Sequence, residues 1–189
     1  DFAATQAIDS AQPFTLRWEP MEGGTSGDYI EIYFEGEEAC YFESPAAGEE
    51  GVLDGTATSV TIPAHTLPPG RTIEGELVFV RVADEDSTSY PGVTGRVSYI
   101  SVTEFTVRTS GEPFAPSLEV RHGGSQATIT VTGEVGFEYE VKVSDDLQNW
   151  TPMFSFWLFD DCDGYRSSFE LVDQVDDVRS RFYQVEQLL

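Results

Sequence analysis

Most of the chain alternates between apolar and polar residues with the two-residue period of a β-strand. In Asp28–Gly36, the clearest case, Ile30, Ile32 and Phe34 fall on one face, and tyrosines and glutamates fall on the other. Similar runs rich in β-branched residues cover 58–62, 76–82 and 97–108, with glycine and proline turns between them. The only stretch with a helical period free of Gly and Pro is 168–178, where we expect a loop with one helical turn. The pattern predicts an all-β protein.

A break in the pattern falls at 109–113, where a long strand ends and glycine and proline arrive together. Beyond it, strands are expected at 117–121, 126–132, 139–144, 153–159 and 181–187. Short strands at this spacing are typical of β-sandwiches. We therefore predict two consecutive antiparallel β-sandwich domains, over 14–110 and 111–189, with residues 1–13 as a lead-in or linker segment.

The chain is strongly acidic, with 34 acidic against 10 basic residues and a net charge of −24. A hydrophobic content of 40% and an aromatic content of 13% nevertheless exclude intrinsic disorder. No apolar run approaches the roughly 18 residues of a membrane span. The acidity argues against nucleic acid and anionic membrane surfaces as partners, because these carry charge of the same sign.

Patterns that carry catalysis are scarce. The two histidines, His65 and His122, lie in separate halves beside turn residues, and there is no Gly-x-Ser-x-Gly string. Phosphate-loop, dinucleotide and zinc-protease strings are absent as well. The many carboxylates leave a glycosidase pair open but single out none. We predict that the chain is not an enzyme.

The acidic segment 159–170 is the best candidate for a cation site. When Asp161 is placed at the third position of a calcium-binding loop, Asp163 and Glu170 fall on the fifth and twelfth. However, Phe159 occupies the first position, where an oxygen ligand belongs, and flanking helices are missing. The segment predicts an acidic solvent loop or, alternatively, a Ca²⁺ site formed by Asp161, Asp163 and Glu170. No other cofactor is expected.

Cys40 and Cys162 share no metal-ligand or redox spacing, and the sequence leaves open whether they form one long-range disulfide. The chain opens with Asp1 and shows no signal peptide. We therefore expect a processed product or a piece of a longer protein.

Aromatic residues are expected on exposed faces. With Ile30 in the core, Tyr29 and Tyr33 point outward beside glutamates, and in the next strand Tyr41 is expected to point outward too. Aromatic rings stack on the apolar faces of sugars, and carboxylates accept their hydroxyl groups. The tyrosines thus predict either binding of neutral sugars or cross-strand pairing that stabilises a sheet. Trp157, on a strand apolar on both faces, is expected to pack against the neighbouring domain or to form a ligand platform.

Several strings resemble known modules. Pro13–Pro20, Leu53–Ala64 and Thr103–Thr106 resemble a module of very large secreted bacterial proteins; Tyr139–Val141, Ser144–Thr151 and Arg181–Val185 resemble a companion module that often stands in tandem with it. The resemblance covers most of the chain. It implies an immunoglobulin-like domain, a smaller fibronectin-III-like domain and an extracellular or cell-surface location, and it transfers no catalytic residues.

The string Ser144-x-Asp146-Leu147-x-x-Trp150 also resembles the hairpin signature in the blades of glycoside-hydrolase propellers. A propeller repeats its sheet in at least about four blades, whereas this string occurs once. We interpret it as a turn that the Ser and Asp side chains stabilise while the Trp packs beneath it.

The sequence therefore predicts a non-catalytic structural or adhesive module of a larger secreted or surface bacterial protein, whose partners are the other domains of that protein. The alternative is a carbohydrate-binding module for neutral glycans that uses Tyr29, Tyr33, Tyr41 or Trp157; like charges disfavour sulfated and uronic-acid polymers. Two further alternatives are a glycan-active enzyme and a filament subunit that assembles by strand addition of Asp1–Gln12.

Overall fold

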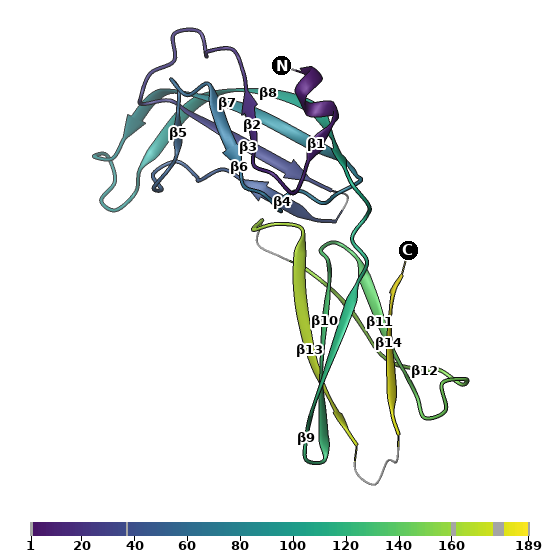
Figure 1. Cartoon of the computed structure of the whole chain (residues 1–189). Coiled ribbons are helices and arrows are strands. Elements are labelled where there is room, and N and C mark those ends of the chain that lie inside the picture. The colour runs from purple at the N-terminus through teal and green to yellow at the C-terminus, as the bar shows by residue number, and fades with distance from the viewer. Residues whose placement is uncertain (1, 37, 160–161, 176–179, 189) are drawn as a thin grey trace.

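A computed structural model of the chain describes residues 2–36, 38–159, 162–175 and 180–188. Within these residues, one short 3-10 helix, Phe2–Gln6 (η1), accompanies fourteen β-strands, most of them paired antiparallel (Figure 1). The predicted all-β fold is confirmed. Among the described residues, no helix is long and apolar enough to cross a lipid bilayer.

The first unit contains strands β1 to β8 (Figure 1). Their bounds are Ile8–Asp9 (β1), Phe14–Arg17 (β2), Tyr29–Glu35 (β3), Cys40–Glu43 (β4), Leu53–Asp54 (β5), Ser59–Ile62 (β6), Thr72–Asp86 (β7) and Gly95–Ser110 (β8). The larger sheet has the order β1-β8-β7-β3-β4, with β5 beside β3, and β2 pairs with β6 in a separate sheet. Ile30, Ile32 and Phe34 are fully buried, as the alternation of β3 predicts.

Residues 2–13 pack on the first unit, and do not form a separate lead-in segment. β1 pairs in parallel with the end of β8, with Ile8 opposite Thr109, and Ile8 belongs to the core cluster. The side-chain amide of Gln6 donates to the carbonyl of Thr106 at 3.0 Å. Burial of an isoleucine side chain contributes about 1.5–3 kcal/mol, which holds this segment on the sheet.

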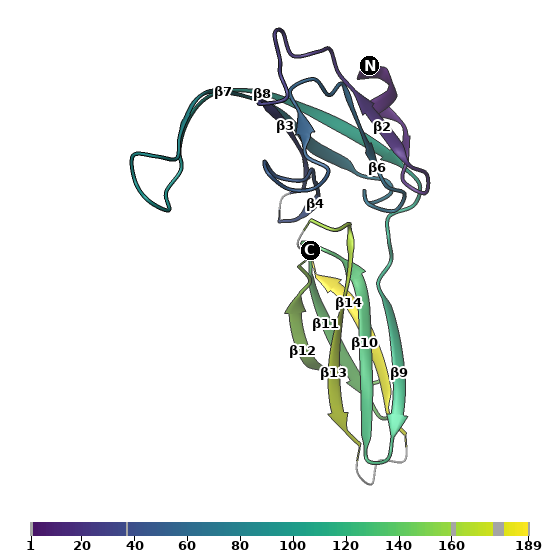
Figure 2. The same cartoon turned by 90° about the vertical axis from the view of Figure 1, so that its left-hand side faces the viewer.

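The second unit contains strands β9 to β14 in two facing sheets (Figure 2). Their bounds are Ser117–Gly123 (β9), Gln126–Glu134 (β10), Glu138–Ser144 (β11), Thr151–Trp157 (β12), Arg166–Gln174 (β13) and Phe182–Leu188 (β14). One sheet has the order β13-β10-β9 and the other β12-β11-β14. Between them lies a core built around Ile129, Val131, Tyr139 and Val141, all fully buried.

The loop with a helical turn expected over 168–178 is wrong for the residues described, because Arg166–Gln174 is strand β13. It pairs with β10 along its whole length, from Arg166 opposite Glu134 to Gln174 opposite Gln126. Phe169 and Leu171 pack on the core, two residues apart. The two-residue period is obscured in the sequence because Asp173 is buried on the same side as Leu171, whereas the apolar Val172 is exposed.

Strands β7 and β8 are longer than the sequence predicts. Beyond Val80, which pairs with Tyr29 of β3, they continue as a two-stranded arm that extends far from the sheet (Figure 2). A register shift between Val82 and Asp84 marks the start of this arm, and such bulges bend and twist a ribbon.

Candidate functional site

A disulfide crosslinks the two units outside the segment that connects them. Cys40 on β4 and Cys162, which are 122 positions apart in sequence, form a disulfide with their Cα atoms 4.7 Å apart. Beside it, Phe42 and Asp163 form an isolated β-bridge between the units. In the chain-entropy model of disulfides, closing a loop of this length stabilises the folded state by about 5 kcal/mol.

A buried ion pair spans the same junction. The guanidinium of Arg71, which precedes β7, donates from Nε and Nη2 to the carboxylate of Glu134 at 3.2 and 3.0 Å. The Glu134 side chain is 0% exposed and that of Arg71 is 33% exposed. The hydrogen bonds to Glu134 raise the pKa of Arg71. The Arg71 guanidinium also lies 5.3 Å from the ring centroid of Phe137.

The hydrophobic core of the first unit continues into the second. Val135 and Tyr165, from the second unit, are buried within the first unit's core cluster. Phe114, in the connecting segment, meets the Tyr165 ring edge-on at 6.0 Å. The guanidinium of Arg166 lies over both rings, at 4.9 and 4.7 Å. The junction is therefore a packed interface and not a flexible hinge.

Gly136 brings the backbones of the two units into close contact. Its φ is +82°, a conformation that favours glycine, and a Cβ atom there would lie 2.8 Å from the Cβ of Ala39. That separation is below van der Waals contact, so this position has no room for a side chain.

A cavity of about 310 Å³ lies along the junction. Tyr41 and Glu38 line it from the first unit, and Glu138 and Trp157 line it from the second. The Trp157 ring stacks on the ring of Phe159, with centroids 6.0 Å apart and 14° between the planes. Trp157 is 45% exposed and Phe159 64% exposed, so the pair forms an accessible aromatic platform beside two carboxylates.

The structure brings together two of the four predicted ligand residues, because Tyr41 and Trp157 line this cavity. The expected outward orientation of Tyr41 is wrong: the residue is 6% exposed and belongs to the core cluster. The reason is a shift in register, in which Phe34 pairs with Phe42 but Glu35 pairs with Cys40, so that Tyr41 has no cross-strand partner. Burial, and then the charge of Glu134, raises the pKa of Tyr41 to about 12.

Tyr29 and Tyr33 do not line the junction cavity. Both are half-buried on β3, where Tyr29 pairs with Val80 and Tyr33 with Glu76 of β7. The guanidinium of Arg96 lies 5.8 Å from the Tyr29 ring centroid. Burial and the neighbouring Glu31 raise the pKa of Tyr33 to about 12. These contacts are those of a stabilising cross-strand arrangement.

The predicted calcium ligands do not share a loop in the residues described. Asp163 forms the β-bridge with Phe42, and Glu170 lies within strand β13, opposite Thr130. A calcium loop would have to curl around the ion through this region, whereas the chain is extended from Arg166 onward. Asp161 lies outside the described residues. In the part of the chain that is described, no three His, Cys, Asp or Glu side chains are placed to hold a metal ion together.

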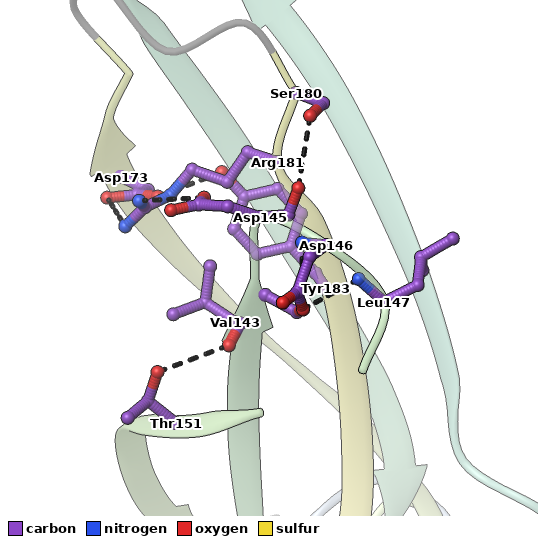
Figure 3. A network of polar contacts seen from close by, with 10 residues as sticks. Val143, Asp145, Asp146, Leu147, Thr151, Asp173, Ser180, Arg181 and Tyr183 are labelled. Atoms are coloured by element: carbon purple, nitrogen blue, oxygen red, sulfur yellow. Dashed lines mark hydrogen bonds and ion pairs between the residues drawn. The ribbon is translucent and has the colours of Figure 1, made fainter. Parts of the chain in front are cut away.

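The string from Ser144 to Asn149 forms the predicted turn, and Figure 3 shows Asp146 and Leu147 of it. The Ser144 hydroxyl accepts the N–H of Leu147 at 2.9 Å, and the Asp146 carboxylate accepts the N–H groups of Gln148 and Asn149 at 2.9 and 2.8 Å. These hydrogen bonds, led by that from Asn149, lower the pKa of Asp146. Leu147 has a φ of 61° at the tip. The carboxylate is thus fully engaged by its own turn.

A second polar group lies next to this turn (Figure 3). Arg181 donates from Nε to Asp173 at 2.5 Å, and the hydroxyl of Tyr183 donates to the same carboxylate at 2.9 Å. Arg181 also approaches Asp145, with an N–O distance of 3.7 Å. Asp173 is 8% exposed. Its partners therefore satisfy a buried carboxylate at the far end of the second unit, which is a structural role.

The two histidines lie in separate units, and the backbone of His65 faces Gly164 of the second unit, where an added Cβ would lie 3.7 Å from the His65 carbonyl oxygen. His65, at a φ of 64°, donates its backbone N–H to the carbonyl of Ser10 at 2.7 Å. His122 is exposed on β9 and pairs with Ala127. Neither lines the cavity beside Trp157.

A scan against models of protein families, a search of curated proteins and a search of solved structures each returned no match. What the junction can do therefore has to be inferred from its own geometry. Its residues can hold two units in one fixed relation, and its aromatic platform with two carboxylates offers the contacts that bind neutral sugars.

Proposed function

We propose that the chain is a non-catalytic structural or adhesive module of a larger secreted or surface bacterial protein. The observation that carries this proposal is the junction, where the Cys40–Cys162 disulfide, the Arg71–Glu134 ion pair and a shared core join the two units. A module that displays other domains at a set distance and angle needs such a junction, because a freely moving hinge would keep neither the distance nor the angle constant. The other domains of the parent protein are its partners.

The finer fold belongs to the same proposal: an immunoglobulin-like domain followed by a smaller fibronectin-III-like domain. Its support in the second unit is the pair of three-stranded sheets that enclose one core. The first unit departs from a simple sandwich, because its six-stranded sheet is curled and β2 and β6 form a sheet of only two strands (Figure 1).

Small-angle X-ray scattering tests the structural role. We expect the oxidised chain to scatter as a single rigid particle and to unfold in one cooperative transition. The double variant Cys40→Ser/Cys162→Ser should scatter as a less rigid particle. Independent motion of the units in the oxidised chain would contradict the proposal, as would turnover of any substrate in a panel of glycans and peptides.

A second candidate function, binding of neutral glycans, is favoured by the stacked Trp157 and Phe159 rings. They are exposed and lie beside the cavity that Glu38 and Glu138 also line. A sugar ring can stack on the indole while its hydroxyls donate to the carboxylates. The net charge of −24 disfavours anionic polysaccharides at the same place.

Affinity electrophoresis against neutral and charged polysaccharides tests this second function, with calcium and with chelator in parallel. Retardation by a neutral glycan should be lost in Trp157→Ala and kept in Tyr90→Ala, whose ring is 73% exposed but far from the junction in sequence and fold. Loss in Tyr33→Ala instead would place the site on β3. If no glycan retards the chain, the sugar proposal fails and the structural proposal stands alone.

A further inference from the structure

Strand β8 has a free edge over most of its length. On one side it pairs with β7 from Gly95 to Arg108. On the other side, β1 pairs only with Thr109 and Ser110, and Gln6 reaches the carbonyl of Thr106. Within the residues described, no strand pairs with the outer edge of β8 between Gly95 and Glu104.

This stretch exposes apolar side chains on both of its faces. Tyr99 is 71% exposed, Ile100 65% and Val102 51%. Successive residues of a strand point to opposite faces, so neither face of the strand is covered here. A long apolar strand with an open edge is a template for pairing with another strand, and soluble proteins usually protect such edges with charges or prolines. Between Val97 and Thr103 this edge carries neither.

The direction of the backbone groups shows which residues can form the new hydrogen bonds. Along an antiparallel strand, the N–H and C=O groups of alternate residues point to opposite sides. Thr109 donates its N–H toward β7, to the carbonyl of Arg71, whereas the carbonyl of Thr106 faces the other way, to Gln6. The even-numbered residues from Ser98 to Glu104 therefore point their N–H and C=O groups toward the open edge.

We propose that a second copy of this chain pairs with the edge, antiparallel and about a twofold axis, with Ile100 opposite Ile100. A twofold interface brings the same strand from both copies together, and this register pairs even-numbered residues with even-numbered residues, as the backbone requires. This register places Ser98 opposite Val102 and Arg96 opposite Glu104. The twofold axis repeats each of these pairs, so the interface contains two Arg96–Glu104 pairs. Opposite charges in directly facing positions stabilise a strand pair.

The charges favour this register over its neighbours. Moving the twofold axis from Ile100 to Tyr99 places Arg96 opposite Val102, so that the arginine has no charged partner. A shift in the other direction places Arg96 opposite Thr106, whose carbonyl Gln6 already occupies. Arg96 also binds Glu85 of its own copy at 2.9 Å. A guanidinium has five N–H donors, so the same group can hold Glu85 and the Glu104 of the second copy.

The net charge of −24 on each copy opposes the pairing at long range. Salt shortens the range of that repulsion, from about 10 Å at 0.1 M to about 3 Å at 1 M. Salt also screens the two Arg96–Glu104 pairs, but these are few against a net charge of −24 on each copy, and the backbone hydrogen bonds and apolar contacts of the edge are not weakened in this way. Self-association through β8 should therefore strengthen as salt is added. A basic partner from another protein would instead be released by salt. The inference does not depend on the proposed function, because the open edge between Gly95 and Glu104 lies outside the junction.

Sedimentation velocity and light scattering of the full chain test the proposal, over a range of concentrations at low and high salt. We expect a monomer–dimer equilibrium that shifts toward the dimer at high salt. Ile100→Lys places two lysines opposite each other on the axis and should weaken the dimer on the order of tenfold or more, because the change acts on both copies. The matched control is Val172→Lys, at a position 51% exposed on the edge strand β13, which should leave the equilibrium unchanged.

A mixing experiment tests the register itself. Arg96→Glu and Glu104→Arg should each be monomeric alone, because each places like charges opposite one another. An equal mixture of the two variants should form a heterodimer, because both cross-strand charge pairs are then restored. This recovery cannot come from a misfolded variant. A chain that stays monomeric at all concentrations and salts would overturn the proposal, as would a dimer that Ile100→Lys leaves intact, a mixture that fails to associate, or equal weakening by Val172→Lys.

Discussion

Arg71 and Glu134, 63 residues apart in sequence, form a two-pronged ion pair in which the glutamate side chain has no exposure to solvent. The hydroxyl of Tyr139 donates to the backbone carbonyl of the same glutamate at 2.9 Å. A carboxylate without water must keep its charged partner, because an unpaired buried charge is costly. The relation between the two units is thus linked to the pairing of one side chain.

Removing the arginine should destabilise the chain more than removing both partners. Arg71→Met leaves the buried carboxylate unpaired, and we expect it to lower the free energy of unfolding by about 2–4 kcal/mol, a range reduced because the arginine is partly exposed. Arg71→Met/Glu134→Leu should recover most of that loss. Urea denaturation measures both. Arg121→Met is the control, since its pair with Glu119 is exposed and should cost under about 1 kcal/mol. Equal losses in the single and double variants would contradict the account.

A side chain at position 136 should force the units apart. Gly136→Ala combines the cost of a left-handed backbone with a contact of 2.8 Å between its Cβ and that of Ala39. The matched control is Gly92→Ala, which has a φ of +78° but nothing within 4 Å of the added Cβ. Backbone strain should lower the free energy of unfolding of both variants by about 1 kcal/mol, and overpacking should lower that of Gly136→Ala by about a further 1–3 kcal/mol. Equal losses of the two variants in urea denaturation would mean that the junction can rearrange to accept the added methyl group.

Reduction of the disulfide should destabilise the whole chain. The crosslink closes a loop of 122 residues that contains most of both units, so its loss should lower the free energy of unfolding by about 2–5 kcal/mol. Denaturation with and without a reductant measures the loss, and Cys40→Ser/Cys162→Ser should match the reduced protein. Unchanged stability would show that noncovalent contacts alone hold the junction.

Four tyrosines should titrate late. Burial is the main cause that raises the pKa values of Tyr33, Tyr41, Tyr139 and Tyr183 to about 12, from an ordinary value of 10.0. The folded state holds these protons more tightly than the unfolded state. Their stabilisation is therefore complete below pH 10 and is lost as the pH rises toward 12. Absorbance of tyrosinate should therefore still increase as the pH approaches 12, because these four tyrosines form a late group. Tyr41→Phe should remove one from the late group, and a single transition near pH 10 would contradict the assignment.

Much of the fold could be predicted from local pattern. The alternation of Asp28–Gly36 correctly predicts which side chains of β3 are buried, because a strand has a strict two-residue period. The same rule applies to β13, where Phe169 and Leu171 mark the inner face. This strand is hard to recognise in the sequence because the polar Asp173 lies on its buried face and the apolar Val172 on its exposed face. The turn at Ser144 could be predicted because its hydrogen bonds join residues close in sequence.

The candidate sites could be predicted only in part. Trp157 was identified as an aromatic that meets a neighbouring domain or a ligand, and it lines the junction cavity. Tyr41 was placed on the wrong face, since an irregular register between β3 and β4 is invisible in either strand alone. Nothing in the sequence paired Arg71 with Glu134. Both occur among many similar charged residues, and only their positions in the fold distinguish them.

The sequence by itself determined that the chain is an acidic, all-β protein and which face of β3 is buried, because side-chain alternation is a local property. The tertiary structure alone decided that Cys40 meets Cys162, that Tyr41 turns inward and that the outer edge of β8 stays open. Each of these depends on how strands distant in sequence align, and that alignment is set by the packing of the whole core.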